Sequence, residues 1–127
     1  MAVREVPIEI WQTVDGCLDN LAAVERIGGD ESVVTWSERL RKLGWDAAAA
    51  HPGPAGANGW PLSADQLSLD LSASDVRFIV ETLDRSKAVT LTLLGNPEPS
   101  IRQQQQESLH LDEQALRFWK GRAAREE

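Results

Sequence analysis

The sequence LSLDLSASDVRFIVETL, residues 67–83, is the strongest indication of fold class because its pattern changes from that of one secondary structure to that of another. Leucines alternate with polar residues over 67–71, which is the two-residue period of a strand. From Val76 onward the apolar residues recur at three- and four-residue steps, as they do in a helix. Between the two patterns, Ser72 and Asp75 have the spacing of a capping box. This stretch therefore predicts a strand that leads directly into a helix.

The N-terminal segment predicts a helix that opens near Pro7. Proline is favoured in the first turn of a helix, and apolar residues then recur at helical spacing as far as Val24. The pair Gly28-Gly29 is expected to stop this helix. A competing interpretation takes residues 6–10 as a short strand before a shorter helix. Gly16 favours that alternative, since a glycine inside a helix costs about 1 kcal/mol relative to alanine.

A second helix is predicted to start at Asp30 or Ser32, either of which can cap it. An apolar stripe follows, and Gly44 suits the left-handed residue just beyond a helix end. In that arrangement Trp45 would fold back on Leu40. The four alanines at 47–50 could add one more turn before the sequence His51-Pro52, which blocks further helix.

Proline and glycine make residues 51–61 an expected irregular loop. A linker between domains would need a foldable unit on each side, and two helices in about 50 residues are too few for a separate core. The prediction is therefore a single domain over residues 1–127, with 51–61 as an internal loop.

The C-terminal half predicts two further strands, because 89–94 alternates and is rich in strand-forming residues and 108–112 alternates again. A last helix would begin after Asp112. The expected fold class is α+β, with two N-terminal helices followed by a small, mostly antiparallel sheet and covering helices. The alternative is an all-α fold in which 74–94 and 101–125 are single helices.

Charge narrows the classes of partner. The chain of 127 residues has a formal net charge of −7, and residues 1–38 carry eight acidic and two basic residues. The richest basic run, RLRK at 39–42, falls near an expected helix end, where cations are favoured anyway. Nucleic-acid binding is therefore not expected, since it usually needs a basic face. An acidic surface instead speeds association with a basic protein.

The distribution of apolar residues indicates where in the cell the protein is expected. The N-terminus lacks the apolar core of a signal peptide, and no stretch approaches the roughly 20 apolar residues of a membrane span. A soluble cytoplasmic protein that does not bind membranes is expected. The excess of arginine over lysine and the abundance of alanine are typical of bacteria with GC-rich genomes.

Groups that could carry catalysis are few and scattered. Cys17, the only cysteine, falls on the apolar stripe of an acidic helix, where a buried, unreactive thiol is expected. With only His51 and His110 besides, no metal-ligand spacing occurs, and no metal or cofactor is expected. His51 could act as a general base only if a carboxylate or a substrate came near it. No phosphate-binding glycine motif or nucleophile elbow occurs.

The unusual feature is the presence of five tryptophans and no tyrosine. Trp45 and Trp60 flank the proline- and glycine-rich loop, where they could pin the loop to the body, line a small-molecule cleft or anchor a partner. Asp15 and Asp19 are one helical turn apart on a face expected to be exposed.

The first functional hypothesis is a non-enzymatic bacterial protein-interaction module, acidic like immunity proteins and inhibitors. Its acidic N-terminal helix face, with Asp15 and Asp19, would bind a more basic partner together with Trp45 and Trp60. The alternative is a small-molecule-binding protein or a tailoring enzyme with a tryptophan-lined cleft at the 51–61 loop, using Trp45, Trp60 and His51. A third hypothesis is a nucleic-acid mimic.

Overall fold

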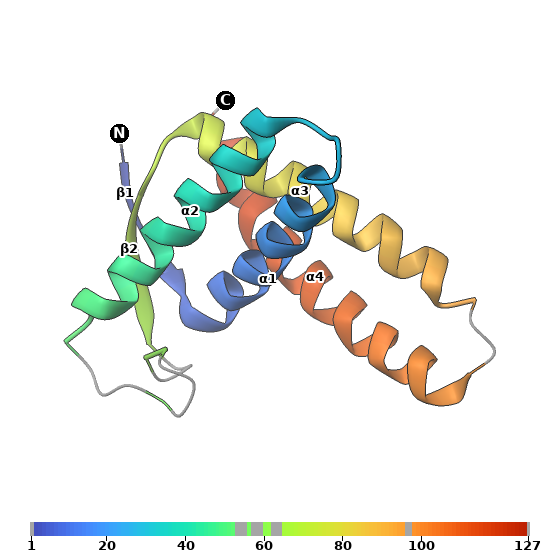
Figure 1. The fold of residues 1–127 in the computed structure, drawn as a ribbon. Helices are drawn as coiled ribbons and strands as arrows, with labels where there is room; N and C mark the ends of the chain where they lie inside the picture. The colour runs from blue at the N-terminus through green and yellow to red at the C-terminus, as the bar shows by residue number, and fades with distance from the viewer. Residues whose placement is uncertain (1, 53–55, 57–59, 62–64, 96–97, 127) are drawn as a thin grey trace. The chain divides into compact units, whose positions relative to one another are not determined.

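The computed structural model describes residues 2–52, 56, 60–61, 65–95 and 98–126. Within these residues the chain forms an α+β fold in which helices dominate, as the sequence predicted (Figure 1). The elements follow one another in the order β1 (Ala2–Pro7), α1 (Ile8–Glu25), α2 (Glu31–Ala50), β2 (Gln66–Leu71), α3 (Ala73–Leu93) and α4 (Pro99–Glu126).

The chain divides into two compact units, Met1–Ser72 and Ala73–Glu127. The predicted loop at 51–61 belongs to the first unit, between α2 and β2. Of that loop the structure describes His51, Pro52, Gly56, Trp60 and Pro61, while the remaining positions lie outside the described residues.

A two-stranded antiparallel sheet joins the beginning and the end of the first unit. β1 pairs with β2 in a register that runs from Ala2 opposite Leu71 to Pro7 opposite Gln66. The alternation predicted for β2 is confirmed, because its three leucines are buried and the intervening polar residues are exposed. Val6 shares the buried face with Leu67. On the other face, the Ser68 hydroxyl donates to Glu5 Oε1 at 2.6 Å.

Both interpretations of the N-terminus were partly correct. The chain is a strand through Pro7, which then caps α1 with an extended ψ of 138°. The helical stripe is buried as expected at Val14 and Leu18, among others, although Val24 at its end is exposed. Gly16 lies on open surface, so its cost is one of helix propensity alone. The helix ends before Gly28, whose φ of +78° requires the left-handed region that glycine favours.

The predicted end of the second helix was wrong. Asp30 caps α2 as expected and accepts the Ser32 amide at 2.9 Å. The bond from the Ser32 hydroxyl, followed by the bond from this amide, lowers the pKa of Asp30. The helix then continues through Gly44 to Ala50 and stops at His51, where ψ is 132°. Gly44 does not end the helix; it lets α2 approach the Trp11 indole of α1, which a Cβ atom at that position would strike. Trp45 is therefore within α2, not folded back beyond its end.

The two strands predicted at 89–94 and 108–112 are wrong, because residues 89–93 and 108–112 are helical. For these segments the all-α alternative was correct, since α3 and α4 are two long helices lying side by side (Figure 1). The threonines in 89–94 alternate as in a strand, but their hydroxyls bond back within the helix. Thr90 Oγ1 donates to the Ser86 carbonyl at 3.0 Å, and Thr92 Oγ1 donates to the Ala88 carbonyl at 3.1 Å.

Asp112, predicted to cap the last helix, is instead in the interior of α4 and almost completely buried. Its Oδ2 accepts the Ser86 hydroxyl of α3 at 3.0 Å. Each helix also has buried apolar residues close in sequence to this hydrogen bond. They are Val76, Ile79 and Leu83 of α3, and Ala115, Leu116 and Trp119 of α4. The second unit is therefore a helical hairpin that combines apolar packing with a buried carboxylate.

Candidate functional site

The structure brings together the two tryptophans that flank the loop. The ring centroids of Trp45 and Trp60 lie 4.0 Å apart, and the ring planes are tilted by 32°. Trp60 is buried, with 6% of its surface exposed, whereas Trp45 is 40% exposed. The contact arises because α2 continues past Gly44, so that Trp45 is carried on a helix and is fixed in direction. One tryptophan thus supports the other and leaves part of it open to solvent.

His51 lies at the end of α2 and faces Asp65, which directly precedes β2. The distance from His51 Nε2 to Asp65 Oδ2 is 3.8 Å, and the histidine side chain is 14% exposed. That distance is too long for a hydrogen bond, although it allows an ion pair when the histidine is protonated. The carboxylate nearest in sequence, Asp46, pairs with Lys42 of its own helix at 2.8 Å. The sequence did not indicate Asp65 as a partner of His51, because 13 residues separate the two positions.

Asp15 and Asp19 both contact Arg41, so they join α1 to α2. Arg41 Nε donates to Asp15 Oδ1 at 3.1 Å, and Arg41 Nη1 donates to Asp19 Oδ1 at 3.0 Å. Asp19 is exposed as expected, but Asp15 is buried, which corrects the prediction that both lie on an exposed face. The helix face turned toward α2 therefore includes Asp15, whose charge is balanced by the guanidinium.

This pairing also affects Arg41 itself. Partial burial alone would lower the pKa of Arg41. The hydrogen bond to Asp15 and the negative charges of Asp15, Asp19 and Glu38 outweigh burial and raise that pKa. Arg41 is consequently a permanently charged tie between the two helices, a role that the basic run RLRK did not reveal.

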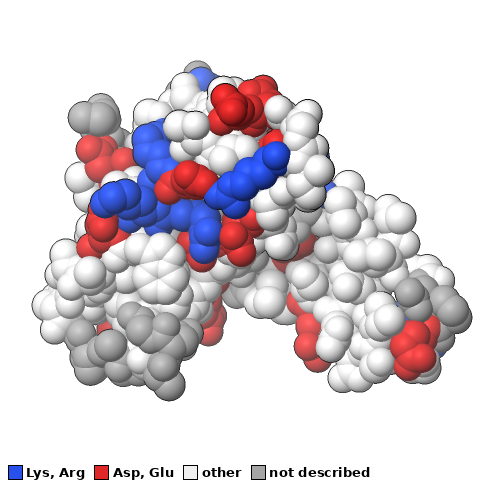
Figure 2. Space-filling view, in the orientation of Figure 1, with Lys and Arg blue, Asp and Glu red and all other residues white. Residues whose placement is uncertain are grey.

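The basic run 39–42 lies in the middle of α2 and not near a helix end, which corrects its interpretation as a dipole-stabilising cluster. Figure 2 shows Lys and Arg side chains gathered over this part of the molecule, with Asp and Glu side chains among them. Arg26 at the end of α1 pairs with Glu38 of α2. This face of the first unit thus carries a mixture of both signs of charge.

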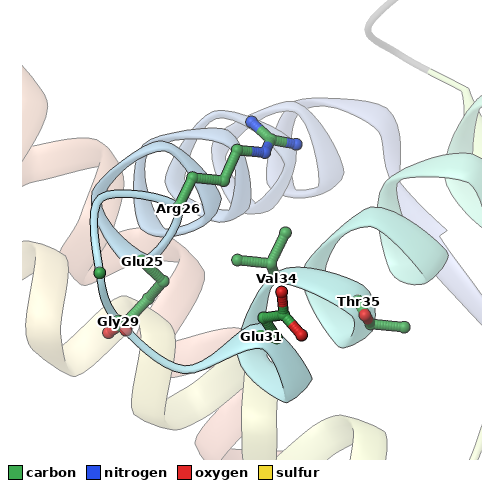
Figure 3. A pocket seen from close by; sticks show the side chains of 7 residues that line it. Glu25, Arg26, Gly29, Glu31, Val34 and Thr35 are labelled. Atoms are coloured by element: carbon green, nitrogen blue, oxygen red, sulfur yellow. The ribbon is translucent and has the colours of Figure 1, made fainter.

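A hollow of about 430 Å³ lies where α1 gives way to α2 (Figure 3). Its lining consists of Glu25, Arg26, Gly28, Gly29, Glu31, Val34 and Thr35. Glu25 already accepts the Asp30 amide at 2.8 Å. Because these polar groups are largely exposed or engaged with their own chain, the hollow offers no buried group aimed at a ligand.

A second hollow, of about 530 Å³, lies along α4 in the second unit. It is lined by Gln103, Gln106, Glu107, His110 and Leu111. These residues come from a single helix, so the hollow is a surface depression rather than a cleft between elements. His110 is exposed there, and no catalytic partner was predicted for it.

Cys17 is buried in α1, as the sequence predicted. Among the described residues, no group of three or more His, Cys, Asp or Glu side chains is placed to hold a metal ion. Within the same residues, no helix combines the length and the apolar character needed to cross a membrane.

No protein-family model matches this chain, and no curated protein or solved structure is detectably similar to it.

Proposed function

We propose that this chain is a non-enzymatic protein-interaction module that engages a more basic partner through the surface formed by Trp45 and Trp60. The observation that carries the proposal is the stacking of a half-exposed tryptophan on a buried one at 4.0 Å. Tryptophan is enriched among the residues that dominate binding energy in protein interfaces.

The support from Trp60 matters because it lowers the cost of binding. An exposed side chain that moves freely loses conformational entropy when a partner immobilises it, at about 0.5–1.5 kcal/mol for each side chain. Trp45 is already held by its helix and by the buried ring of Trp60. A partner would therefore meet a preformed apolar surface.

The negative net charge supports the choice of a basic partner, but it affects the rate of association more than the energy of binding. The formal net charge of −7 favours encounters with a positively charged protein. Asp19 is exposed but, like the buried Asp15, it pairs with Arg41, so the attraction comes from the acidic excess of the whole chain rather than from these two residues. We accordingly assign binding energy to the tryptophan pair and association rate to the acidic surface.

The test compares Trp45→Ala with Ile27→Ala. Ile27 is the matched control because it is also an exposed apolar residue of the first unit, on the turn after α1. Each tagged variant is expressed in cells, crosslinked and recovered, after circular dichroism has shown that it folds. We expect at least one protein to be recovered with the parent chain and with Ile27→Ala but reduced about tenfold with Trp45→Ala.

Salt separates the two parts of the proposal. Recovery that falls steeply as salt increases supports the electrostatic attraction of a basic partner. If recovery does not change with salt but still depends on Trp45, the partner is not basic, and the role of Trp45 in binding stands. If no recovered protein depends on Trp45, the proposal fails.

The small-molecule alternative makes a different prediction. Neither of the two hollows described above includes Trp45, Trp60 or His51. The alternative would replace the interaction module if a metabolite changed the tryptophan fluorescence of the parent chain and had no effect on Trp45→Ala.

A further inference from the structure

The strand β1 has an edge with which no described strand pairs. Within the described residues the sheet of the first unit consists of β1 and β2, so each strand has a neighbouring strand on one side only. The helix α2 packs against β2, whereas β1 packs against β2 and against the helix that follows it. Val3 of β1 is 71% exposed. The side of β1 that faces away from β2, which we call the β1 edge, is therefore the open side of this sheet.

The register identifies the backbone groups that point outward at the β1 edge. The Ile8 amide donates to the Asp65 carbonyl at 3.0 Å, and this pair continues the register that joins β1 to β2. Bonded pairs alternate in an antiparallel sheet, so the even-numbered residues of β1 direct their backbone groups toward β2. Val3 and Glu5 direct theirs to the β1 edge, where no described backbone group bonds to them. An added strand is the structure that satisfies such a row of donors and acceptors.

The side chains beside the β1 edge are acidic or apolar. Val3 and Glu5 lie on the exposed face of the sheet, while Val6 is completely buried on the other face. Within β1 and β2 the exposed face carries two carboxylates, Glu5 and Asp70, and no basic residue. The Ser68 hydroxyl donates to Glu5 Oε1 at 2.6 Å, which holds this carboxylate over the sheet. Its Oε2 has no partner among the described residues, so it can accept a cation.

A second copy of this chain fits the β1 edge poorly. Two β1 strands related by a two-fold axis would pair through the residues that point outward. Val3 opposite Glu5 places the two Arg4 side chains directly opposite each other. Glu5 opposite Glu5 places two carboxylates together, and Pro7 then has no N–H for the Val3 carbonyl. Val3 opposite Val3 joins a single bonded pair within β1. Because like charges directly opposite destabilise a strand pair, the sequence of β1 disfavours self-pairing.

We propose that the β1 edge accepts an extended segment of a different chain, with a basic residue followed two positions later by an apolar one. In antiparallel addition the basic residue lies opposite Glu5 and the apolar residue lies opposite Val3. The main-chain bonds select an extended backbone, and the carboxylates of the exposed face select a positive charge. Arg4 does not oppose this charge, because it lies on the other face, where its Nε donates to the Leu71 carbonyl at 3.2 Å.

The experiment titrates the full chain, labelled with ¹⁵N, with the blocked peptide Thr-Lys-Thr-Val-Thr. We expect saturable shifts of the Val3 and Glu5 amide resonances, with a dissociation constant of about 0.1 to 3 mM for so short a contact. Replacing the lysine of the peptide by glutamate should weaken binding at least about fivefold, because the peptide then meets like charge.

Methylated peptides test the backbone contact separately. Methyl groups on the lysine and valine nitrogens remove the two N–H donors that face β1, so binding should be lost. Methylation of the central threonine nitrogen is the matched control, because that N–H points away from β1, and it should change the dissociation constant by less than about threefold.

A reversal of charge in the chain tests the choice of partner. Glu5→Lys should bind the glutamate peptide at least about fivefold more tightly than the lysine peptide, which is the reverse of the parent chain. The matched control is Glu81→Lys, which makes the same change in charge at an exposed position of α3 and should keep the preference for lysine. Circular dichroism establishes that both variants fold.

Four results would overturn the inference. These are the absence of saturable shifts at Val3 and Glu5 up to about 10 mM peptide, equal binding of the peptide methylated on lysine and valine, a Glu5→Lys chain that still prefers lysine, and shifts of the same amides when the chain alone is concentrated. The last result would assign the β1 edge to a second copy. Trp45→Ala should bind the lysine peptide as the parent chain does, so this outcome and that of the tryptophan surface are independent.

Discussion

The two units fasten a pair of helices in different ways. In the first unit, α1 and α2 approach closely where Gly44 meets Trp11, Arg41 bridges Asp15 and Asp19, and a sheet ties the ends of the unit together. In the second unit, α3 and α4 have apolar packing at one end and a buried carboxylate near the middle, and the outer end remains open.

The two units therefore differ in which apolar side chains remain exposed. Interlocking of a large side chain with a glycine fixes the position of α1 against α2 along their length. The hairpin instead combines apolar packing with the hydrogen bond between Asp112 and Ser86. Beyond that bond, Val89, Leu91 and Leu93 of α3 are exposed. The first unit therefore exposes part of Trp45 on α2, whereas the second exposes apolar side chains on more than one side of α3.

The largest expected effect comes from Gly44→Ala. The new Cβ would collide with the Trp11 indole, so the helices must separate, and we expect the free energy of unfolding to fall by about 3 kcal/mol. Gly16→Ala is the control, because its Cβ would meet nothing within 4 Å and should add about 0.5–1 kcal/mol through helix propensity. Urea unfolding followed by circular dichroism measures both. Equal gains for the two variants would show that α1 and α2 are not interlocked at this point.

A smaller loss is expected from Asp112→Ala in the second unit. This change removes the buried carboxylate that accepts the half-buried Ser86 hydroxyl and should cost about 2 kcal/mol. Asp112→Asn retains an acceptor oxygen and should cost less than half as much. Glu113→Ala, which removes a half-exposed partner of Lys87 at 3.9 Å, should cost under about 0.5 kcal/mol. Hydrogen exchange of the α3 amides measures the change locally. Equal effects of Asp112→Ala and Glu113→Ala would show that the hydrogen bond between Ser86 and Asp112 does not stabilise the hairpin more than an exposed ion pair does.

The smallest of the three effects is expected from Arg41→Ala. It leaves the buried Asp15 without its guanidinium partner, and we expect a loss of about 1 kcal/mol in the free energy of unfolding. Lys42→Ala is the neighbouring control, because its exposed pair with Asp46 lies within one helix and should contribute about 0.3–0.5 kcal/mol at most. The same urea experiment applies. A loss for Lys42→Ala as large as that for Arg41→Ala would mean that the bridge does not hold the helices together.

Local signals in the sequence predicted much of the first unit. Asp30 capped α2, the leucines of β2 alternated, and His51-Pro52 ended the helix, because each of these effects acts over a few residues. Gly44 misled the prediction, since a glycine at a helix end and a glycine at a close contact look the same in sequence. Only the position of Trp11 in space distinguishes them.

The prediction of strands in the second unit was wrong because a local pattern was again compatible with two structures. Alternation over 89–94 describes a strand well, but a helix can also contain it when threonine hydroxyls bond back to the preceding turn. The site could be anticipated only in part. The tryptophans were singled out by their position around the loop, whereas the partners Arg41 and Asp65 come from separate segments that the fold alone brings near Asp15 and His51.

The pairing of β1 with β2 has a consequence for how the first unit is made. Ala2 lies opposite Leu71, so the strand synthesised first cannot find its partner until nearly the whole unit has left the ribosome. Pairing the two strands carries a loop-closure cost that the local hydrogen bonds of a helix do not have to meet, and contacts distant in sequence slow folding. The helices are thus expected to form during synthesis, and the arrival of β2 is the event that completes the unit.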